Sequence, residues 1–447
     1  MVRDDRSDIY IAEIASKTTR KITSNPGPDS EPRWSPDGRS IAFVSDPNSS
    51  APIADGTLTM AVVNARLMLY DVASGSIKSA EGFDGSVGEP EWTPDSRRTV
   101  FTAGKGVYRE VFSYEIASGR FTQVTKGRIA TLGGMSRDGS RAAAVLESAS
   151  TPPDLFVSDL TFAAPRKLTS LNPEASEFAL GETEIVRWKS SDGVEVEGVL
   201  QKPVAFAAGT RYPLLVAVHG GPAGAFIDNY RVTTGDGGQH WAGQGWAVLY
   251  PNPRGSSNYG ERFLRASIPD WGGGDFRDIM SGVDALISRG IADPERLAIL
   301  GWSYGGYMTA WAVTQTNRFK AAMVGAGLTN LWSMYGTNDI PNTLAAYFKG
   351  LPNTVNLPLY KERSALTHAG KVTTPTLILH GAADERVPIG QPMEFYRALK
   401  DRGVRTELVF YPRAGHGLTE YYHQLDRLQR QFDWITTHGG GRGTTSP

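Results

Sequence analysis

The run GWSYGG at 301–306 follows the apolar stretch LAIL at 297–300 and has the form G-x-S-x-G. This pattern is typical of a nucleophile elbow, the sharp turn at which a buried strand passes into a helix. A side chain at Gly301 or Gly305 would collide with neighbouring backbone, and the turn raises the Ser303 hydroxyl above the sheet. A serine between two glycines also occurs in ordinary surface loops, so the interpretation depends on what the rest of the chain supplies.

Two later strand patterns end in residues that can activate a serine. The stretch TLIL at 376–379 leads into HGAAD at 380–384, and ELVFYP at 407–412 leads into RAGHG at 413–417. Asp384 alone could cap a helix, and His416 alone could lie on a surface loop. In α/β-hydrolases, however, the triad follows the order Ser, Asp, His, and open α/β sheets gather such residues at the carboxyl ends of their strands. We therefore expect Ser303, Asp384 and His416 to form a catalytic triad.

A glycine-rich loop after an earlier strand can complete such a site. The apolar stretch LLVAV at 214–218 is followed by HGGP at 219–222. The backbone amides of Gly221 and of Tyr304, the residue after the nucleophile, are the expected donors to an oxyanion. One such donor is typically worth about 3 kcal/mol of transition-state stabilisation. For His219 and His380, which also lie at strand ends, we expect structural hydrogen bonds.

Composition excludes several classes of protein. The chain has 447 residues, no cysteine, and 46 basic against 47 acidic side chains, for a net charge of −1. The lack of cysteine excludes disulfides, thiolate zinc sites and a cysteine nucleophile. No metal or nucleotide motif stands out, so we expect no metal and no cofactor. We also expect no nucleic-acid partner, no membrane partner and a cytoplasmic location, because basic patches, long apolar runs and a signal-peptide pattern are lacking.

The first 175 residues carry short alternating strand patterns with an internal repeat. The segment EPRWSPDG at 31–38 returns as EPEWTPDS at 89–96 and, more weakly, as GMSRDG at 134–139. The spacing of the later copies is that of propeller blades, about 40–50 residues. We expect three blades and an initial half-blade, with Trp34 and Trp92 packed between blades.

The pattern changes near residue 175, where we expect a domain boundary. The prediction is a partial β-propeller of about three to four blades over 1–175, an α/β-hydrolase catalytic domain over 176–438, and a disordered tail over 439–447. The second domain should begin with an edge hairpin at Trp188 and close with a helix over about 419–437. Its sheet should be mostly parallel and doubly wound.

The C-terminal half resembles the prolyl oligopeptidase family of serine peptidases, and within it the acylaminoacyl-peptidase-like branch. The resemblance is carried by HGGPAG at 219–224, NPRGSSNYGERF at 252–263, WGGGDFRDIMSGVDAL at 271–286, GWSYGGYMT at 301–309, HGAADERVP at 380–388 and YPRAGHG at 411–417. It implies Ser303 as nucleophile, Asp384 as orienting carboxylate and His416 as general base and acid. It also implies Gly221 and Tyr304 as oxyanion donors.

The substrate pocket is less constrained by the sequence. The resemblance suggests that Arg386 holds a backbone carbonyl of a peptide substrate, although a salt-bridged surface arginine is the alternative. Val387 should face the site. Trp332 and Tyr335, in the loop after the strand at 321–324, are candidate aromatic walls, although aromatic residues at strand ends more often belong to the core.

The propeller is shorter than the family implies, because its members usually carry seven blades over the active site and this chain has room for about four. Three explanations are open: a truncated product, a short form whose sheet edges pair with another subunit in a homo-oligomer, or a small four-bladed ring.

The expected activity is hydrolysis of short peptides, including N-acylated ones, through an acyl-enzyme on Ser303. A carboxylesterase that acts on small esters would use the same machinery. A propeller-based binding protein with an inactive hydrolase domain is the alternative from another class.

Overall fold

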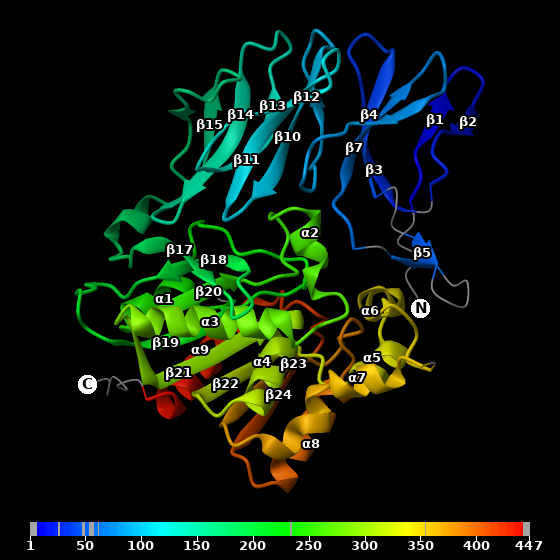
Figure 1. The fold of residues 1–447 in the computed structure, drawn as a ribbon. Helices are drawn as coiled ribbons and strands as arrows, with labels where there is room; N and C mark the ends of the chain where they lie inside the picture. Colours follow the sequence, from blue (N-terminus) through cyan, green and yellow to red (C-terminus); the bar gives the residue numbers. More distant parts are fainter. Residues whose placement is uncertain are drawn as a thin grey trace.

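The computed structural model describes residues 7–440 except 26, 47–49, 53–57, 61, 233–234 and 354. An all-β N-terminal part lies above an α/β part in the view of Figure 1. The expected disordered tail falls outside the described residues from 441 onward.

Mostly antiparallel sheets form the N-terminal part. A two-stranded sheet joins β1 (Tyr10–Glu13) and β2 (Thr18–Lys21), and a second hairpin joins β5 (Ser50–Pro52) and β6 (Leu58–Met60). The first four-stranded sheet consists, in order, of β3 (Asp29–Trp34), β4 (Ser40–Ser45), β7 (Arg66–Asp71) and β8 (Ile77–Ser79). The next four strands are β9 (Glu91–Trp92), β10 (Arg98–Lys105), β11 (Tyr108–Glu115) and β12 (Arg120–Gln123). The last four are β13 (Ile129–Met135), β14 (Ala142–Ser148), β15 (Thr151–Ser158) and β16 (Arg166–Lys167). One parallel pair joins β11 and β13.

These three sets of four strands are the blades that the repeat predicts, and β1–β2 is the half-blade. Each of the three copies of the repeat forms the same turn. The hydroxyls of Ser35, Thr93 and Ser136 each donate, at 2.6 Å, to the aspartate two residues further on. The backbone N–H of each hydroxyl residue also bonds to the carbonyl five residues ahead, which closes the hairpin. The hydroxyl-x-Asp pattern is therefore turn chemistry rather than a ligand site.

Only one of the two repeated tryptophans packs as expected. Trp92 is buried between blades, and its indole N–H donates to the Arg33 carbonyl of the preceding blade at 2.9 Å. Trp34 is instead exposed. The expectation for Trp34 is wrong because, among the described residues, the preceding unit consists of β1 and β2 alone and offers no strand equivalent to β3.

A single eight-stranded sheet forms the centre of the α/β part. Its strands, in spatial order, are β17 (Thr183–Lys189), β18 (Glu195–Gln201), β20 (Ala247–Asn252), β19 (Tyr212–Val218), β21 (Ala292–Trp302), β22 (Phe319–Gly325), β23 (Thr376–Gly381) and β24 (Thr406–Tyr411). The first three strands pair in antiparallel fashion, and all pairs from β20 to β24 are parallel. Strand β17 begins at Thr183, before the predicted hairpin start at Trp188. The α/β-hydrolase fold is confirmed, and the predicted boundary near 175 falls between β16 and β17.

Helices cover both faces of this sheet. Successive residues of a strand point to opposite faces, and on β19 Leu214 and Val216 join one core while Leu215 and Ala217 join the other. The first core contains α3 (Gly274–Ser288), α4 (Tyr304–Gln315) and α8 (Gly390–Asp401). The second contains α1 (Gly238–Gly243) and α9 (Tyr421–His438), the helix expected over about 419–437. The remaining helices are α2 (Glu261–Leu264), α5 (Leu331–Thr337), α6 (Pro341–Phe348) and α7 (Leu357–Glu362).

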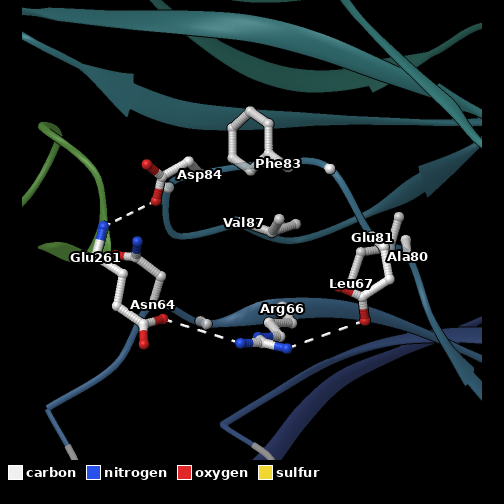
Figure 2. A pocket seen from close by; sticks show the side chains of 12 residues that line it. Asn64, Arg66, Leu67, Ala80, Glu81, Phe83, Asp84, Val87 and Glu261 are labelled. Carbon is white, nitrogen blue, oxygen red and sulfur yellow. Dashed lines mark hydrogen bonds and ion pairs between the residues drawn. The ribbon is translucent and has the colours of Figure 1, made fainter.

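Loops join the blades to the α/β part. Gly106 and Asn258 exchange hydrogen bonds, with the Gly106 N–H donating to the Asn258 carbonyl at 2.9 Å. Asp84 accepts the Glu261 N–H at 2.8 Å beside a polar cavity of about 280 Å³ (Figure 2). In that cavity the Arg66 guanidinium lies 3.9 Å from the carboxylates of Glu81 and Glu261. Helix α2 is thus fixed to the blade loop by polar contacts.

In the part of the chain that the structure describes, no helix is long and apolar enough to span a membrane. Nor do three or more His, Asp or Glu side chains in the described ranges gather in a way that could hold a metal ion.

Candidate active site

Ser303 occupies the turn between β21 and α4 with φ 63° and ψ −123°. A non-glycine residue at positive φ is strained and persists only where its surroundings enforce it. The flanking glycines supply that enforcement. A Cβ on Gly301 would lie 2.4 Å from the Gly305 backbone, and one on Gly305 would lie 2.1 Å from the Val218 carbonyl oxygen. The geometry of this turn agrees with the nucleophile elbow that the sequence predicts.

The three residues predicted as a triad meet above the strand ends. His416 Nε2 lies 2.9 Å from Ser303 Oγ, and His416 Nδ1 lies 2.8 Å from Asp384 Oδ2. The other Asp384 oxygen, Oδ1, accepts the backbone N–H groups of Arg386 and Val387, each at 2.9 Å. These bonds hold Oδ1 in place and leave Oδ2 to face the imidazole.

The loop that carries His416 is held by a residue of the elbow. The Trp302 indole N–H donates to the His416 carbonyl at 2.8 Å. This contact fixes the histidine backbone relative to the nucleophile. No role for Trp302 was predicted from the sequence. Its position within the G-x-S-x-G motif, next to the nucleophile, is the signal that could have identified it.

Two further histidines at strand ends have structural roles, as expected. His219 Nδ1 lies 2.8 Å from the Gly220 carbonyl, its Nε2 lies 2.9 Å from Ser256 Oγ, and burial lowers its pKa to about 4. His380 Nε2 lies 2.7 Å from the Val387 carbonyl, and burial lowers its pKa as well. Both rings are neutral near pH 7, and they brace the loops that follow β19 and β23.

The glycine-rich loop packs directly on the elbow. A Cβ on Gly220 would lie 3.4 Å from the Ser303 Cβ, and Gly221 has φ 129°, a conformation that favours glycine. Gly221 and Ser303 line the same cavity. Tyr304 begins α4, so its N–H is among the unsatisfied donors of a helix start. Neither amide has a hydrogen-bond acceptor among the described residues. Two free N–H groups therefore lie beside the serine.

A narrow apolar cavity of about 40 Å³ opens beside Ser303. The apolar side chains that line it are Trp271, Leu328, Met334, Ile340, Leu344 and Val387. Arg386 also lines it, and its Nε lies 2.6 Å from Asp339 Oδ1. The prediction placed Arg386 and Val387 at the site, and the structure brings both there, with Arg386 already in an ion pair.

The structure brings neither Trp332 nor Tyr335 to this cavity. Both lie on helix α5 rather than in a loop, and its buried face consists of Leu331 and Met334, three residues apart. Trp332 is 49% exposed beneath the Lys361 ammonium, and the Tyr335 ring packs 6.5 Å from that of Tyr360. Met334 takes the place predicted for the aromatic residues because the helix turns that face toward the site.

Beneath the cavity lies a buried carboxyl group that the sequence analysis did not assign. Asp275 accepts the Tyr304 hydroxyl and the N–H groups of Gly272 and Phe276, the latter two at 3.1 and 2.7 Å. Burial raises the pKa of Asp275 to about 7. The Trp271 ring packs edge-on against that of Tyr304, with centroids 5.0 Å apart. The WGGGDF segment therefore positions the cavity wall through Tyr304.

A second, wider cleft of about 610 Å³ also reaches Ser303. It is lined by the elbow, by the histidine loop and by α9, through residues that include Trp302, His416, Leu418 and Arg427. The two hollows share Ser303, and His416 lines only the wider one.

Comparison with known proteins agrees with this geometry. The profile of the prolyl oligopeptidase family matches residues 236–442, which include the elbow and all three triad residues. Residues 236–442 are thus similar to this family. The "Uncharacterized peptidase YuxL" of Bacillus subtilis is 38% identical over 278 residues, which are 61% of this chain and 42% of that protein. The porcine "Acylamino-acid-releasing enzyme" is 26% identical over 463 residues, which are 97% of this chain and 62% of the enzyme.

Solved structures of the family superpose over the whole chain. The acylaminoacyl peptidase of Pyrococcus horikoshii has a TM-score of 0.83 at 25% identity, covering 100% of this chain and 68% of its own. An acylaminoacyl peptidase solved with Z-Gly-Gly-Phe-chloromethyl ketone has a TM-score of 0.82 at 26% identity, with the same coverage. The chain is thus similar to acylaminoacyl peptidases, and it spans less than two thirds of the length of the two relatives above.

Proposed function

We propose that the protein is a serine peptidase that hydrolyses short peptides, including N-acylated ones, through an acyl-enzyme on Ser303. One observation carries the proposal: a continuous chain of hydrogen bonds runs from Ser303 through His416 to Asp384 beside two free amides. The relatives named as acylamino-acid-releasing enzymes and the neighbour bound to a peptidyl chloromethyl ketone support the choice of substrate class.

The mechanism follows from these positions. His416 Nε2 accepts the Ser303 proton as Oγ attacks the acyl carbonyl, and Asp384 holds the Nδ1 proton and stabilises the imidazolium. The amides of Gly221 and Tyr304 donate to the oxyanion of the tetrahedral intermediate, and the positive end of α4 adds to their effect. His416 then gives the proton to the leaving amine, and water repeats the sequence on the acyl-enzyme.

The apolar cavity supports a proposed position for the acyl part of the substrate. Its lining of Trp271, Leu328, Met334 and Val387 suits an apolar side chain on the residue before the scissile bond. Arg386 lies at the same cavity, where its guanidinium is a candidate donor to a substrate carbonyl and is held in place by Asp339. Assembly into a homo-oligomer and a cytoplasmic location stay predictions.

The test compares N-acetyl-leucine p-nitroanilide with p-nitrophenyl acetate for the wild-type protein and for Ser303→Ala. The proposal expects amide hydrolysis that Ser303→Ala abolishes and that the exposed serine control Ser288→Ala retains. Ester hydrolysis without any amide hydrolysis would instead favour the carboxylesterase. Inactivity toward both substrates would favour a binding protein with an inactive hydrolase domain.

A further inference from the structure

Arg427 on α9 lines the wider cleft beside Ser303 and His416. Its guanidinium carbon lies 4.2 Å from the centre of the Trp302 ring, so the side chain is stacked on the elbow. Within the described residues it forms no ion pair or hydrogen bond, and its Nε is buried without an acceptor. Arg254, by contrast, forms ion pairs with Asp278 and Asp192.

The surroundings of Arg427 do not neutralise its charge. Asp236 and Tyr411 are the groups that favour its charged form, and Asp236 already pairs with Arg231 at 2.9 Å. Burial lowers the pKa of Arg427 to about 10, which still leaves the guanidinium protonated near pH 7. A half-buried cation without a carboxylate partner, facing an open cleft, is suited to an anionic ligand.

The cleft lies on the leaving-group side of the scissile bond. The apolar cavity and the cleft meet at Ser303, and His416 lines only the cleft. Because His416 must give its proton to the leaving amine, the leaving group has to lie on the side of His416. The part of a peptide that follows the scissile bond therefore enters the cleft that holds Arg427.

We propose that Arg427 binds the free α-carboxylate of the leaving group, so that the enzyme favours substrates that end one or two residues after the scissile bond. This inference rests on the proposed peptidase function. A guanidinium is a fixed fork of donors that matches a carboxylate, and stacking on Trp302 restricts its orientation before substrate binds. A longer peptide would place its carboxylate beyond this residue and would gain nothing from it.

The test uses acetyl-Leu-Gly with a free carboxylate and the otherwise identical acetyl-Leu-Gly amide, with release of acetyl-leucine followed by chromatography. For the wild-type protein we expect kcat/KM to be about ten-fold or more higher for the acid. Arg427→Met keeps an apolar stem over Trp302 and should bring the ratio of the two substrates close to one. Arg427→Lys should retain part of the preference.

Arg430→Met is the matched control, because Arg430 lies on the same helix and pairs with Asp426 at 2.7 Å. It should leave the ratio unchanged, which excludes a general effect of net charge. Equal hydrolysis of acid and amide by the wild-type protein would overturn the inference while leaving the peptidase function intact. Equal losses on both substrates in Arg427→Met would show that the residue only supports Trp302. Failure of the wild-type protein to hydrolyse either peptide would overturn the proposed function itself.

Discussion

Replacing Asp384 by asparagine changes one atom of the triad, and the structure determines which way the new amide must face. Oδ1 of Asp384 accepts two backbone N–H groups, from Arg386 and Val387. If the NH₂ group took that position, it would confront two donors and leave them unpaired, at about 1–3 kcal/mol each. The asparagine oxygen therefore stays there, and the NH₂ group faces His416 Nδ1.

In this orientation of the asparagine amide, His416 can no longer act as the general base. Nδ1 of His416 must then accept a hydrogen bond, so the ring proton moves to Nε2, the atom that lies 2.9 Å from Ser303 Oγ. A protonated Nε2 cannot take the serine proton. In the general triad mechanism the same exchange lowers kcat by about 10⁴-fold, or about 5.4 kcal/mol. We expect a loss of this size in Asp384→Asn.

The assay is the kcat for N-acetyl-leucine p-nitroanilide, together with thermal unfolding followed by circular dichroism. Asp426→Asn, which breaks an exposed ion pair with Arg430, is the matched control and should retain full activity. Asp384→Asn should unfold within a few degrees of the wild-type protein, because both hydrogen bonds to Oδ1 persist. A folded Asp384→Asn protein with kcat within ten-fold of the wild type would refute the assigned role.

Three further predictions concern the support of the site. Trp302→Phe removes the N–H that holds the His416 carbonyl but keeps the ring, so kcat should fall about ten-fold with little change in KM, and a change in KM alone would contradict this. Gly305→Ala places a Cβ against the Val218 carbonyl and should cost about 3 kcal/mol or more in urea unfolding, whereas near-native stability would argue against the elbow geometry. Because burial raises the pKa of Asp275 to about 7, the protonated carboxyl group stabilises the fold at low pH. That contribution to stability is lost as the pH rises through 7. The free energy of unfolding should therefore decrease by about 1.4 kcal/mol per pH unit between about pH 5 and 7 relative to Asp275→Asn, and parallel profiles would contradict it.

The predicted residues that the structure brings together are those fixed by local backbone chemistry. Gly301, Ser303 and Gly305 encode a turn that few other residues can adopt, and Asp384 and His416 come directly after apolar strand patterns. A parallel sheet brings the ends of such strands to one edge, so their meeting could be expected without coordinates. The blade hairpins could be predicted for the same reason, because their hydroxyl-x-Asp turns are encoded by local sequence.

The residues that the sequence missed or misplaced depend on packing between distant segments. Leu331 and Met334 are the buried residues of α5, and their packing in the core determines which face of the helix points toward the site. The sequence around Trp332 does not show this orientation. Arg427 is more than a hundred residues from Trp302 in the sequence. The two side chains meet only because α9 packs against the sheet in the folded protein. The exposure of Trp34 depends on the neighbouring unit rather than on its own repeat.

Ser303 is the proposed nucleophile, and His416 and Asp384 are proposed to activate it. Labelling with a fluorophosphonate, followed by peptide mapping in a mass spectrometer, tests this assignment most directly. We expect a single adduct, on Ser303, that forms rapidly in the wild-type protein and is lost in Ser303→Ala. An adduct on another residue, or labelling that persists unchanged in Ser303→Ala, would contradict it.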